Sequence, residues 1–271
     1  MTKISISLAQ MHIELAQPDA NLEQAIGFIK QASTKQSDVI LFPELWSSGY
    51  DLKHADRYEP INDSILEVLS GLAISEKMAI GGSLLEKVDG QFYNTFYFID
   101  KDGQVIGKYR KIHLFRLMHE DRWLQAGNQP QTVNFPWGMD TEAIMAGMAI
   151  CYDLRFPELF RHYALGNVKL VCLPSEWPSI RINHWKVLLQ ARAIENQMFI
   201  AAVNCTGTTG KETFGGASAI ISPWGEVLAE GDSQSEALLT AEIDFDQVER
   251  IRQMIPIFQD RRPDIYRLSD S

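Results

Sequence analysis

Apolar and polar residues follow two periods along the chain, and the first residues already show both. Residues 4–10 alternate between apolar and polar side chains, which is typical of a strand with one buried face. Residues 21–32 place apolar side chains at helical spacing, and Asn21 is the expected N-cap. Residues 38–42 form an uninterrupted apolar run that stops at Pro43, as a strand buried on both faces does.

The same patterns predict alternating strands and helices through the rest of the chain. Helices are expected at 64–78, 158–165, 184–196 and 245–254. Strands are expected at 78–85, 94–99, 105–109, 142–151, 168–173, 198–204, 217–222, 226–229 and 238–243. Asp-Gly pairs and the Pro-Trp-Gly turn at 223–225 separate several of these strands.

Two segments resemble each other, DVILFPELW at 38–46 and VKLVCLPSEWP at 168–178. Each is a buried strand that follows a helix, stops at a proline and is followed by a glutamate and a tryptophan. This similarity indicates two related halves. No linker rich in Pro, Gly or Ser divides them, so we expect an α/β fold with one domain over 1–271 and a polar tail at 255–271. Sheets should pack together with helices outside.

Composition narrows the function classes. The 271 residues carry a net charge of −10 and no long basic run, so nucleic acid and anionic membrane surfaces are poor partners. No run approaches the roughly 20 apolar residues of a membrane span. Cys151, Cys172 and Cys205 show no CxxC spacing, which argues against a disulfide framework and suits a reducing, cytoplasmic location.

Cys151 is the first candidate for chemistry. It ends the apolar stretch AGMAIC and precedes the polar turn YDLRFPE, so it should lie at the carboxyl end of a strand, beside the start of a helix. Backbone N–H groups there favour negative charge, and we expect them to favour the thiolate. The alternative is a small buried apolar residue, which is the interpretation that we prefer for Cys172 and Cys205.

Two charged residues could assist this thiol. Glu44 follows VILFP at another strand end, where partial desolvation suits a general base, although a solvated loop glutamate is the simpler alternative. Lys111 in GKYRKIHLF could stabilise an oxyanion, or be a solvated charge like its neighbour Lys108.

Other chemistries find less support in the sequence. It contains no GxSxG, no phosphate-binding glycine loop and no GxGxxG, and His119-Glu120 lacks the second histidine of a zinc site. A cysteine–histidine pair stays open, with four candidate histidines: His113, His119, His162 and His184. The residue pattern alone therefore predicts a thiol without a unique partner.

Three motifs are similar to those of a known family. FPELW (42–46), YRKIHLF (109–115) and CYDLRFPE (151–158) resemble, in order, the glutamate, lysine and cysteine motifs of the nitrilase (carbon–nitrogen hydrolase) superfamily. The resemblance continues through LPSEWP (173–178), ARAIENQ (191–197) and the Pro-Trp-Gly turn, so it covers nearly the whole chain.

This resemblance implies a four-layer α-β-β-α sandwich and chemistry without a metal or organic cofactor. It implies that Cys151 is the nucleophile and Glu44 the general base. Lys111 and the backbone N–H of Tyr152 would stabilise the tetrahedral oxyanion. Glu120, in HLFRLMHED, matches a second glutamate that orients the lysine and the substrate.

Within the superfamily the motifs look most like those of omega-amidases, which cleave the terminal amide of dicarboxylic monoamides such as 2-oxoglutaramate and succinamate. Such a substrate needs a cation for its distal carboxylate, and Arg181 and Arg116 are the candidates. Trp177, in the PSEWP motif that precedes Arg181, is expected to contact the substrate. Arg155 and Glu158 should support the cysteine loop.

Several alternatives remain open at this stage. The amide could instead belong to a deaminated-glutathione-type peptide, an N-carbamoyl amino acid or an aliphatic amide, and a nitrile is less favoured. A catalytically silent binding module is the alternative from another class. The resemblance also implies a homodimer, formed through residues 156–165 and the C-terminal tail.

Overall fold

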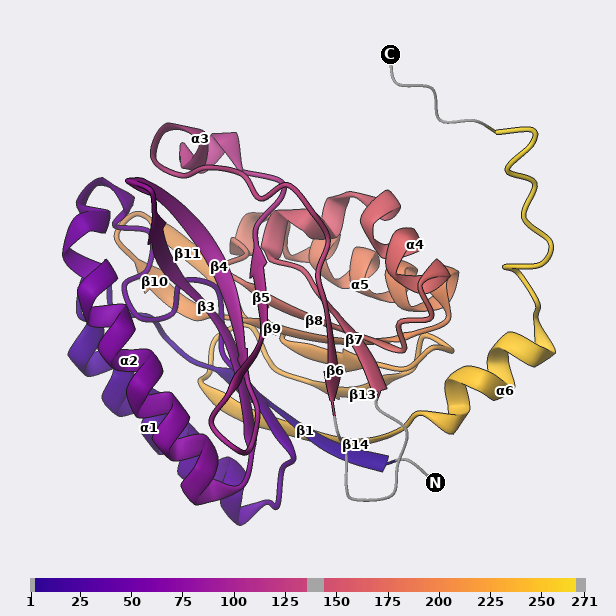
Figure 1. Cartoon of the computed structure of the whole chain (residues 1–271), viewed down its shortest axis with the longest axis horizontal. Coiled ribbons are helices and arrows are strands. Elements are labelled where there is room, and N and C mark those ends of the chain that lie inside the picture. Colours follow the sequence, from indigo (N-terminus) through magenta and orange to yellow (C-terminus); the bar gives the residue numbers. More distant parts are fainter. Residues whose placement is uncertain (1–2, 136–143, 267–271) are drawn as a thin grey trace.

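Two six-stranded sheets pack face to face between two pairs of helices in this computed structural model, which describes residues 3–135 and 144–266 (Figure 1). Helices α1 (Pro18–Thr34) and α2 (Ala55–Glu76) cover one outer face, and α4 (Pro157–Leu165) and α5 (Ile182–Asn196) cover the other. The predicted α-β-β-α sandwich is confirmed.

The first sheet has a parallel centre and antiparallel flanks. Its order is β14 (Ala237–Asp244), β1 (Lys3–Gln10), β2 (Val39–Leu41), β3 (Ala79–Val88), β4 (Gln91–Ile99) and β5 (Val105–Arg110). Strands β1, β2 and β3 are parallel, and the other pairs are antiparallel. The last strand of the chain thus returns to pair with the first.

The second sheet repeats this plan. Its order is β13 (Val227–Glu230), β12 (Ala219–Ile221), β9 (Phe199–Asn204), β8 (Leu170–Ser175), β7 (Ile144–Met148) and β6 (Thr132–Phe135). Strands β7, β8 and β9 are parallel. Strands β2 and β8 lie within the two similar sequence segments. Each is the middle strand of three parallel strands.

Smaller elements complete the chain. These are β10 (Thr206–Thr209), β11 (Glu212–Gly215), α3 (Glu120–Trp123), α6 (Asp246–Met254) and four 3₁₀ turns, η1 (Leu52–His54), η2 (Arg116–Met118), η3 (Cys151–Arg155) and η4 (Ser179–Arg181). β10 and β11 pair as a hairpin outside both large sheets.

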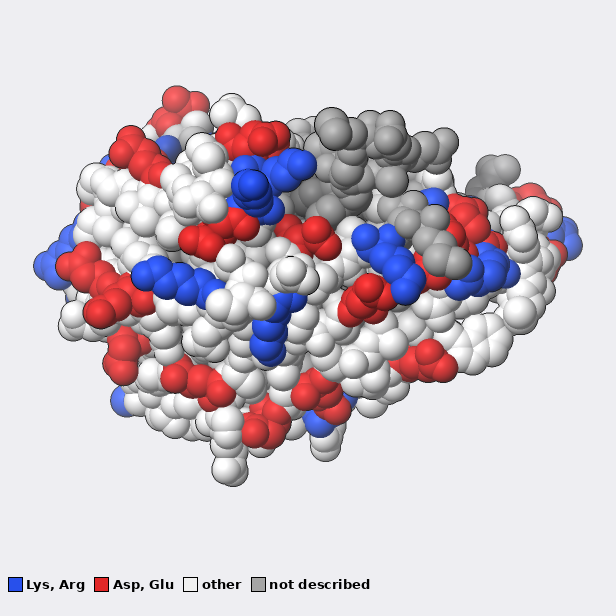
Figure 2. Space-filling model, turned by 90° about the horizontal axis from the view of Figure 1, so that it is seen from below, with Lys and Arg blue, Asp and Glu red and all other residues white. Residues whose placement is uncertain are grey.

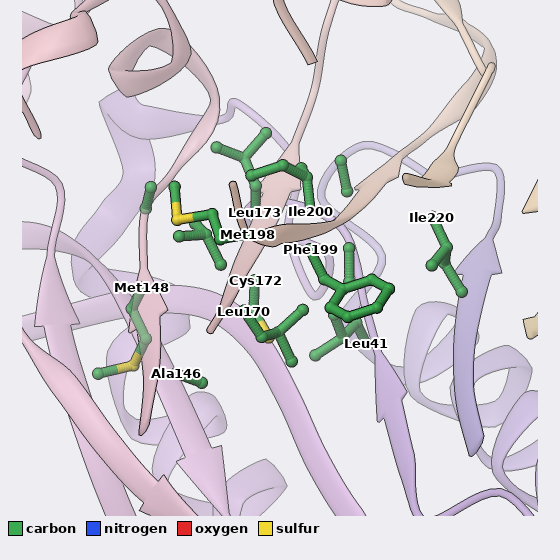
Figure 3. Close-up of a cluster of buried hydrophobic side chains, with 14 of the residues drawn as sticks. Leu41, Ala146, Met148, Leu170, Cys172, Leu173, Met198, Phe199, Ile200 and Ile220 are labelled. Atoms are coloured by element: carbon green, nitrogen blue, oxygen red, sulfur yellow. The ribbon is translucent and has the colours of Figure 1, made fainter. Parts of the chain in front are cut away.

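The largest apolar cluster lies between the sheets (Figure 3). Leu41 of β2, Met148 of β7 and Phe199 of β9 pack there, and Cys172 is among them. Every residue of β2 and of β8 is buried, which explains why their sequences are apolar without alternation. Cys172 and Cys205 are core residues, as the sequence predicts.

Two helix starts differ from the sequence prediction. α1 begins at Pro18, and Asn21 is not its N-cap: the Asn21 side chain is buried and bonds Glu14 and the carbonyl of Ser47 instead. α2 begins at Ala55, nine residues before the predicted start, and contains Pro60 in its second turn, although a proline there removes an intrahelical hydrogen bond.

The strands also differ in part. β6, β10 and β11 were not predicted, because they are short and mostly polar. The predicted strand at 142–151 ends at Met148, and residues 142–143 lie outside the described residues.

The surface carries charges of both signs. Figure 2 shows Asp and Glu interspersed with Lys and Arg over one face, without a broad basic area on that face. No helix in the described ranges is both long and apolar enough to cross a membrane.

Candidate active site

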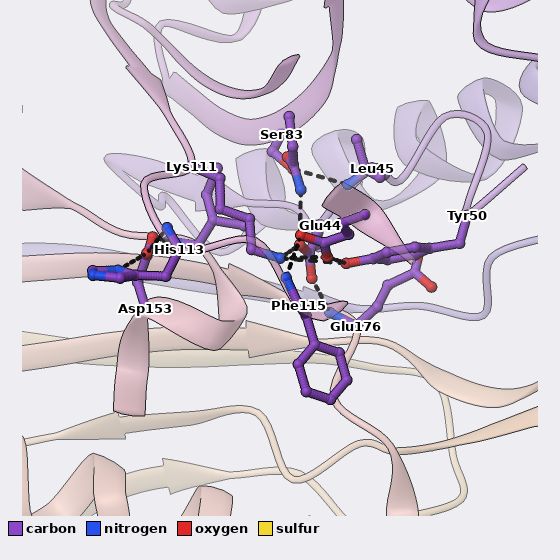
Figure 4. Close-up of polar contacts among 12 residues, drawn as sticks. Glu44, Leu45, Tyr50, Ser83, Lys111, His113, Phe115, Asp153 and Glu176 are labelled. Atoms are coloured by element: carbon purple, nitrogen blue, oxygen red, sulfur yellow. Dashed lines mark hydrogen bonds and ion pairs between the residues drawn. The ribbon is translucent and has the colours of Figure 1, made fainter. Parts of the chain in front are cut away.

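Four buried chemical groups meet where strands end. Glu44 follows β2, Lys111 follows β5, Cys151 opens η3 after β7, and Glu176 follows β8. Carboxyl ends of parallel strands meet at one edge of a sheet, and here the edges of the two sheets face each other. The backbone N–H of Glu176 donates to Glu44 Oε2 over 2.9 Å and joins the two halves of the molecule (Figure 4).

Glu44 is completely buried and its carboxylate is held on both oxygens. Oε1 accepts hydrogen bonds from Lys111 Nζ at 2.7 Å and from Asn94 Nδ2 at 2.8 Å. The next residue, Leu45, has a left-handed backbone (φ 44°), and its N–H donates to Ser83 Oγ. The carboxylate is therefore fixed in one orientation before any substrate binds.

Lys111 lies between two carboxylates. Its ammonium donates to Glu44 Oε1 at 2.7 Å and to Glu120 Oε1 at 2.6 Å, while the Tyr50 hydroxyl lies at 3.5 Å. Burial opposes the charge, but the negative charges of Glu120 and Glu44 outweigh burial and raise the pKa of Lys111 well above its ordinary value. Lys111 is therefore expected to stay charged. Two of its three N–H donors bind carboxylates, and the third has only the distant Tyr50 hydroxyl as a hydrogen-bond acceptor.

Glu120 is the first residue of α3 and is also fully buried. Its Oε1 accepts a hydrogen bond from Tyr50, and its Oε2 accepts one from the backbone N–H of Phe115 at 2.9 Å. Burial raises the pKa of Glu120, partly against the effect of Lys111. The structure thus brings Glu120 to the place that the family resemblance implies, next to the lysine.

Cys151 has an unusual backbone and is nearly inaccessible. Its φ of 44° lies in the left-handed region, where a residue with a side chain is strained, and only 6% of its surface is exposed. Burial raises the pKa of the thiol well above its ordinary value, Glu44 adds to this, and Lys111 opposes it. The expectation that the helix start would favour a thiolate is therefore wrong for the resting site, because burial dominates.

Asp153 holds the loop that carries the cysteine. Its carboxylate accepts hydrogen bonds from Tyr109 of β5 at 2.7 Å, from the backbone N–H of Ile150 at 2.8 Å and from His113. It therefore ties Cys151 in one sheet to the strand of Lys111 in the other. A role for Asp153 was not predicted from the sequence, although this residue lies inside the CYDLRFPE motif.

The predicted supports of the cysteine loop need correction. Glu158 is exposed on α4 and lines a surface groove with Arg161 and Tyr266. The residue beneath the loop is Arg192 of the ARAIENQ motif, whose guanidinium donates twice to the carbonyl of Leu154. Arg155 instead lies over the ring of Trp177, 4.8 Å from its centroid.

A tight cavity of about 10 Å³ opens onto Cys151. Its lining residues come from η3, η4 and two loops: Phe115, Cys151, Tyr152, Arg155, Glu176, Trp177, Pro178 and Arg181. This described lining includes no histidine, so the structure does not place any of the four candidate histidines there.

Three of the four expected substrate-binding residues line this cavity. They are Tyr152, Trp177 and Arg181; the Arg181 guanidinium lies 5.3 Å from the ring of Phe115. Arg116 does not: it is exposed and lines a neighbouring groove with Ile112 and Leu117. Arg155 lines the cavity in its place.

Glu176 was not recognised from sequence as a site residue. It is 1% exposed and lines the cavity beside Cys151. The similarity between FPELW and PSEWP could have indicated this residue, because each glutamate follows the middle strand of the three parallel strands in its sheet. Among the described residues, no group of three or more His, Cys, Asp or Glu is arranged to hold a metal ion.

Residues 5–253 match the carbon-nitrogen hydrolase family, so the chain belongs to this family of enzymes that hydrolyse carbon–nitrogen bonds. It is 40% identical over 268 residues to the 2-oxoglutaramate amidase of Bacillus subtilis (strain 168), covering 97% of this chain and 100% of that protein. It is 33% identical over 277 residues to the omega-amidase NIT2 of Homo sapiens, covering 98% of each.

A solved structure has the same fold. An amidase from Nesterenkonia sp. AN1 matches with a TM-score of 0.85 and 25% identity, covering 97% of this chain and 95% of that chain. In that mutant enzyme the acetamide moiety of fluoroacetamide is covalently added at the active site cysteine.

Proposed function

We propose that the protein is a cysteine amidase that converts the terminal amide of a small dicarboxylic monoamide, such as 2-oxoglutaramate or succinamate, to acid and ammonia. One observation carries the proposal: a single small cavity joins the Cys151 thiol to two guanidinium groups, those of Arg155 and Arg181. The thiol suits the amide end, and the guanidinium groups suit the distal carboxylate. The similarity to proteins named 2-oxoglutaramate amidase and omega-amidase supports this substrate class.

In the first half of the proposed reaction, Cys151 Sγ attacks the amide carbon while Glu44 takes the thiol proton. The C–O double bond becomes an oxyanion in the tetrahedral intermediate. The intermediate collapses when the C–N bond breaks and Glu44 returns the proton to nitrogen. Ammonia leaves and a thioester on Cys151 remains.

In the second half, water attacks the thioester carbon and Glu44 accepts a proton from this water. The C–S bond breaks, the sulfur takes the proton back from Glu44, and the acid is released. Because both halves use the same base, the fixed orientation of Glu44 serves each of them.

Lys111 and the backbone N–H of Tyr152 are the proposed oxyanion donors. Glu44 and Glu120 hold two of the three lysine donors at 2.7 and 2.6 Å, which leaves the third for the developing charge. Tyr152 is in the first turn of η3, where backbone N–H groups have no partner within the helix. The role of Glu120 is to orient this lysine.

The two guanidinium groups in the cavity lining favour a substrate that carries a carboxylate over an uncharged amide. A simple aliphatic amide would leave both guanidinium groups without an anion. A silent binding module would not need a buried lysine held between two carboxylates.

Ammonia release from succinamate and 2-oxoglutaramate tests the proposal. We expect turnover by the wild type and none by Cys151→Ala, with Cys172→Ala as the matched control because Cys172 is equally buried but lies in the core. Turnover by Cys151→Ala would contradict the nucleophile, and silence of the wild type on both compounds would contradict the substrate class.

We further propose a homodimer formed through α4 and the C-terminal tail. Leu165 of α4 is 48% exposed, and tail residues Ile257 and Tyr266 line a groove with Arg161 of α4. Sedimentation of the wild type and of a chain ending at residue 254 tests this. We also place the protein in the cytoplasm, since three free cysteines suit a reducing compartment, and cell fractionation tests that placement.

A further inference from the structure

Glu176 is a buried carboxyl group with no hydrogen-bond partner. Both of its side-chain oxygens lack a donor or acceptor among the described residues, whereas each oxygen of Glu44 and of Glu120 has at least one. Native proteins rarely leave a buried polar group in this state, because the lost interaction with water is not replaced. Glu176 is also one of the residues that line the cavity next to Cys151.

Its surroundings favour the protonated form of this carboxyl. Burial raises the pKa of Glu176 well above its ordinary value, and the charges of Glu44 and Glu120 act in the same direction against Lys111. The other titratable or charged groups that face it are the following: Tyr50, Cys151, Cys205, Arg155 and Arg181. In either protonation state the carboxyl group of Glu176 offers an oxygen that accepts a hydrogen bond.

A primary amide brings two N–H donors into this cavity, and they need acceptors once water is excluded. Glu44 Oε1 already accepts two hydrogen bonds, Oε2 accepts the backbone N–H of Glu176, and the carboxylate also interacts with the thiol. Of the other lining side chains, Arg155 and Arg181 only donate, and Trp177 donates to the carbonyl of Arg181. Tyr152 offers the only rival side-chain acceptor in the described lining.

We propose that the Glu176 carbonyl oxygen accepts a hydrogen bond from the substrate's amide NH₂ group, and that this contact selects amides over esters of the same acid. An ester has no N–H at that position and gains nothing from the acceptor. The assignment rests on the proposed amidase function, because it names a further substrate contact in the same site.

The test compares kcat/KM for succinamate with kcat/KM for monomethyl succinate, two substrates that share the acyl group and the thioester intermediate. Glu176→Met removes the acceptor and keeps the volume, and we expect it to lower the amide value roughly tenfold, as for one lost hydrogen bond, and the ester value little. Glu176→Gln keeps the acceptor and should retain the wild-type ratio. Tyr152→Phe, the matched removal of the rival acceptor, should not change the ratio.

The outcomes separate the two proposals. Equal losses on both substrates in Glu176→Met would show a structural role and overturn the assignment, as would a ratio that changes in Tyr152→Phe instead. These results leave the amidase function standing, because wild-type turnover is measured first. No wild-type turnover of either substrate would overturn the proposed function and the assignment together.

Discussion

Lys111 is stable as a buried cation only because two carboxylates surround it. A lone buried charge costs several kcal/mol, and removing one partner of a buried pair leaves that cost uncompensated. Here Glu44 and Glu120 both contact Nζ, and neither the lysine nor its partners are exposed. The second carboxylate therefore stabilises the cation and also fixes its direction.

Glu120→Gln should separate these effects. It removes one negative charge next to Lys111 but keeps the volume, so we expect kcat on succinamate to fall roughly 10²-fold with little change in KM. Steady-state kinetics checks this, with exposed Glu158→Gln as the control. A change confined to KM would contradict a role in orienting the oxyanion donor.

Arg181→Ala should raise KM for succinamate roughly tenfold, because a charge-assisted contact with the carboxylate is lost. KM for butyramide, which has no carboxylate, should change little. Arg116→Ala is the control, since Arg116 lies outside the cavity. Equal effects of Arg181→Ala on both compounds would dismiss the contact.

At this scale the sequence predicts the groups but not their contacts. Glu44, Lys111 and Cys151 lie at the ends of predicted strands, in motifs that resemble those of the family, and Glu120 follows from that resemblance alone. Tyr50, Asn94 and Glu176 contact these groups across loops and sheets, and no local pattern encodes such distances. The sequence likewise could not show that Arg155 and not Arg116 lines the cavity, because this depends on which loop bounds it.

Strands β3, β4 and β5 share a cluster of polar and charged side chains around the buried Glu86. Glu86 of β3 accepts hydrogen bonds from Thr95 of β4 and Arg110 of β5, and Lys108 forms an ion pair with it. Burial alone would raise the pKa of Glu86, but the bonds from Arg110, Lys108 and Thr95 lower it to about 2. These contacts hold the strand that carries Lys111.

Glu86→Gln should make the free energy of unfolding less dependent on pH. The lowered pKa stabilises the fold above about pH 4.5, and this contribution disappears as the pH falls toward 2. We expect the wild type to lose roughly 2–3 kcal/mol more than the variant between pH 6 and pH 2.5. Urea unfolding at both pH values measures this, and parallel losses would contradict it.

Strongly patterned elements were predicted well, and boundaries less so. The strands with continuous apolar runs, β2 and β8, carry their burial in their composition. The start of α2 before Pro60 was not predicted, because the preceding turn η1 decides where the helix begins. β10 and β11 pair with each other across residues 210–211, and their short sequences lack the apolar alternation that predicts a strand.

A hydrogen bond between Tyr109 and Asp153, both buried, joins the two sheets at the site. Tyr109 lies near the end of β5 in the first sheet, and Asp153 belongs to the turn after β7 in the second. This contact sets the position of Lys111 relative to Cys151.

Tyr109→Phe should therefore affect both stability and rate. We expect a loss of roughly 1–2 kcal/mol in the free energy of unfolding and a clear fall in kcat. The control is Tyr163→Phe, which removes a buried hydroxyl bonded to the carbonyl of Met148 within one half of the molecule. That variant should lose similar stability with kcat nearly unchanged, and equal falls in kcat would contradict the argument.

Burial of the thiols bears on oxidative damage. All three cysteines are buried, and burial raises the pKa of each. Peroxides react with exposed thiolates, and burial disfavours the thiolate at all three sites. In the proposed mechanism Cys151 loses its proton as it attacks a bound substrate, so we expect the enzyme to keep its activity under oxidant doses that inactivate enzymes with a standing thiolate.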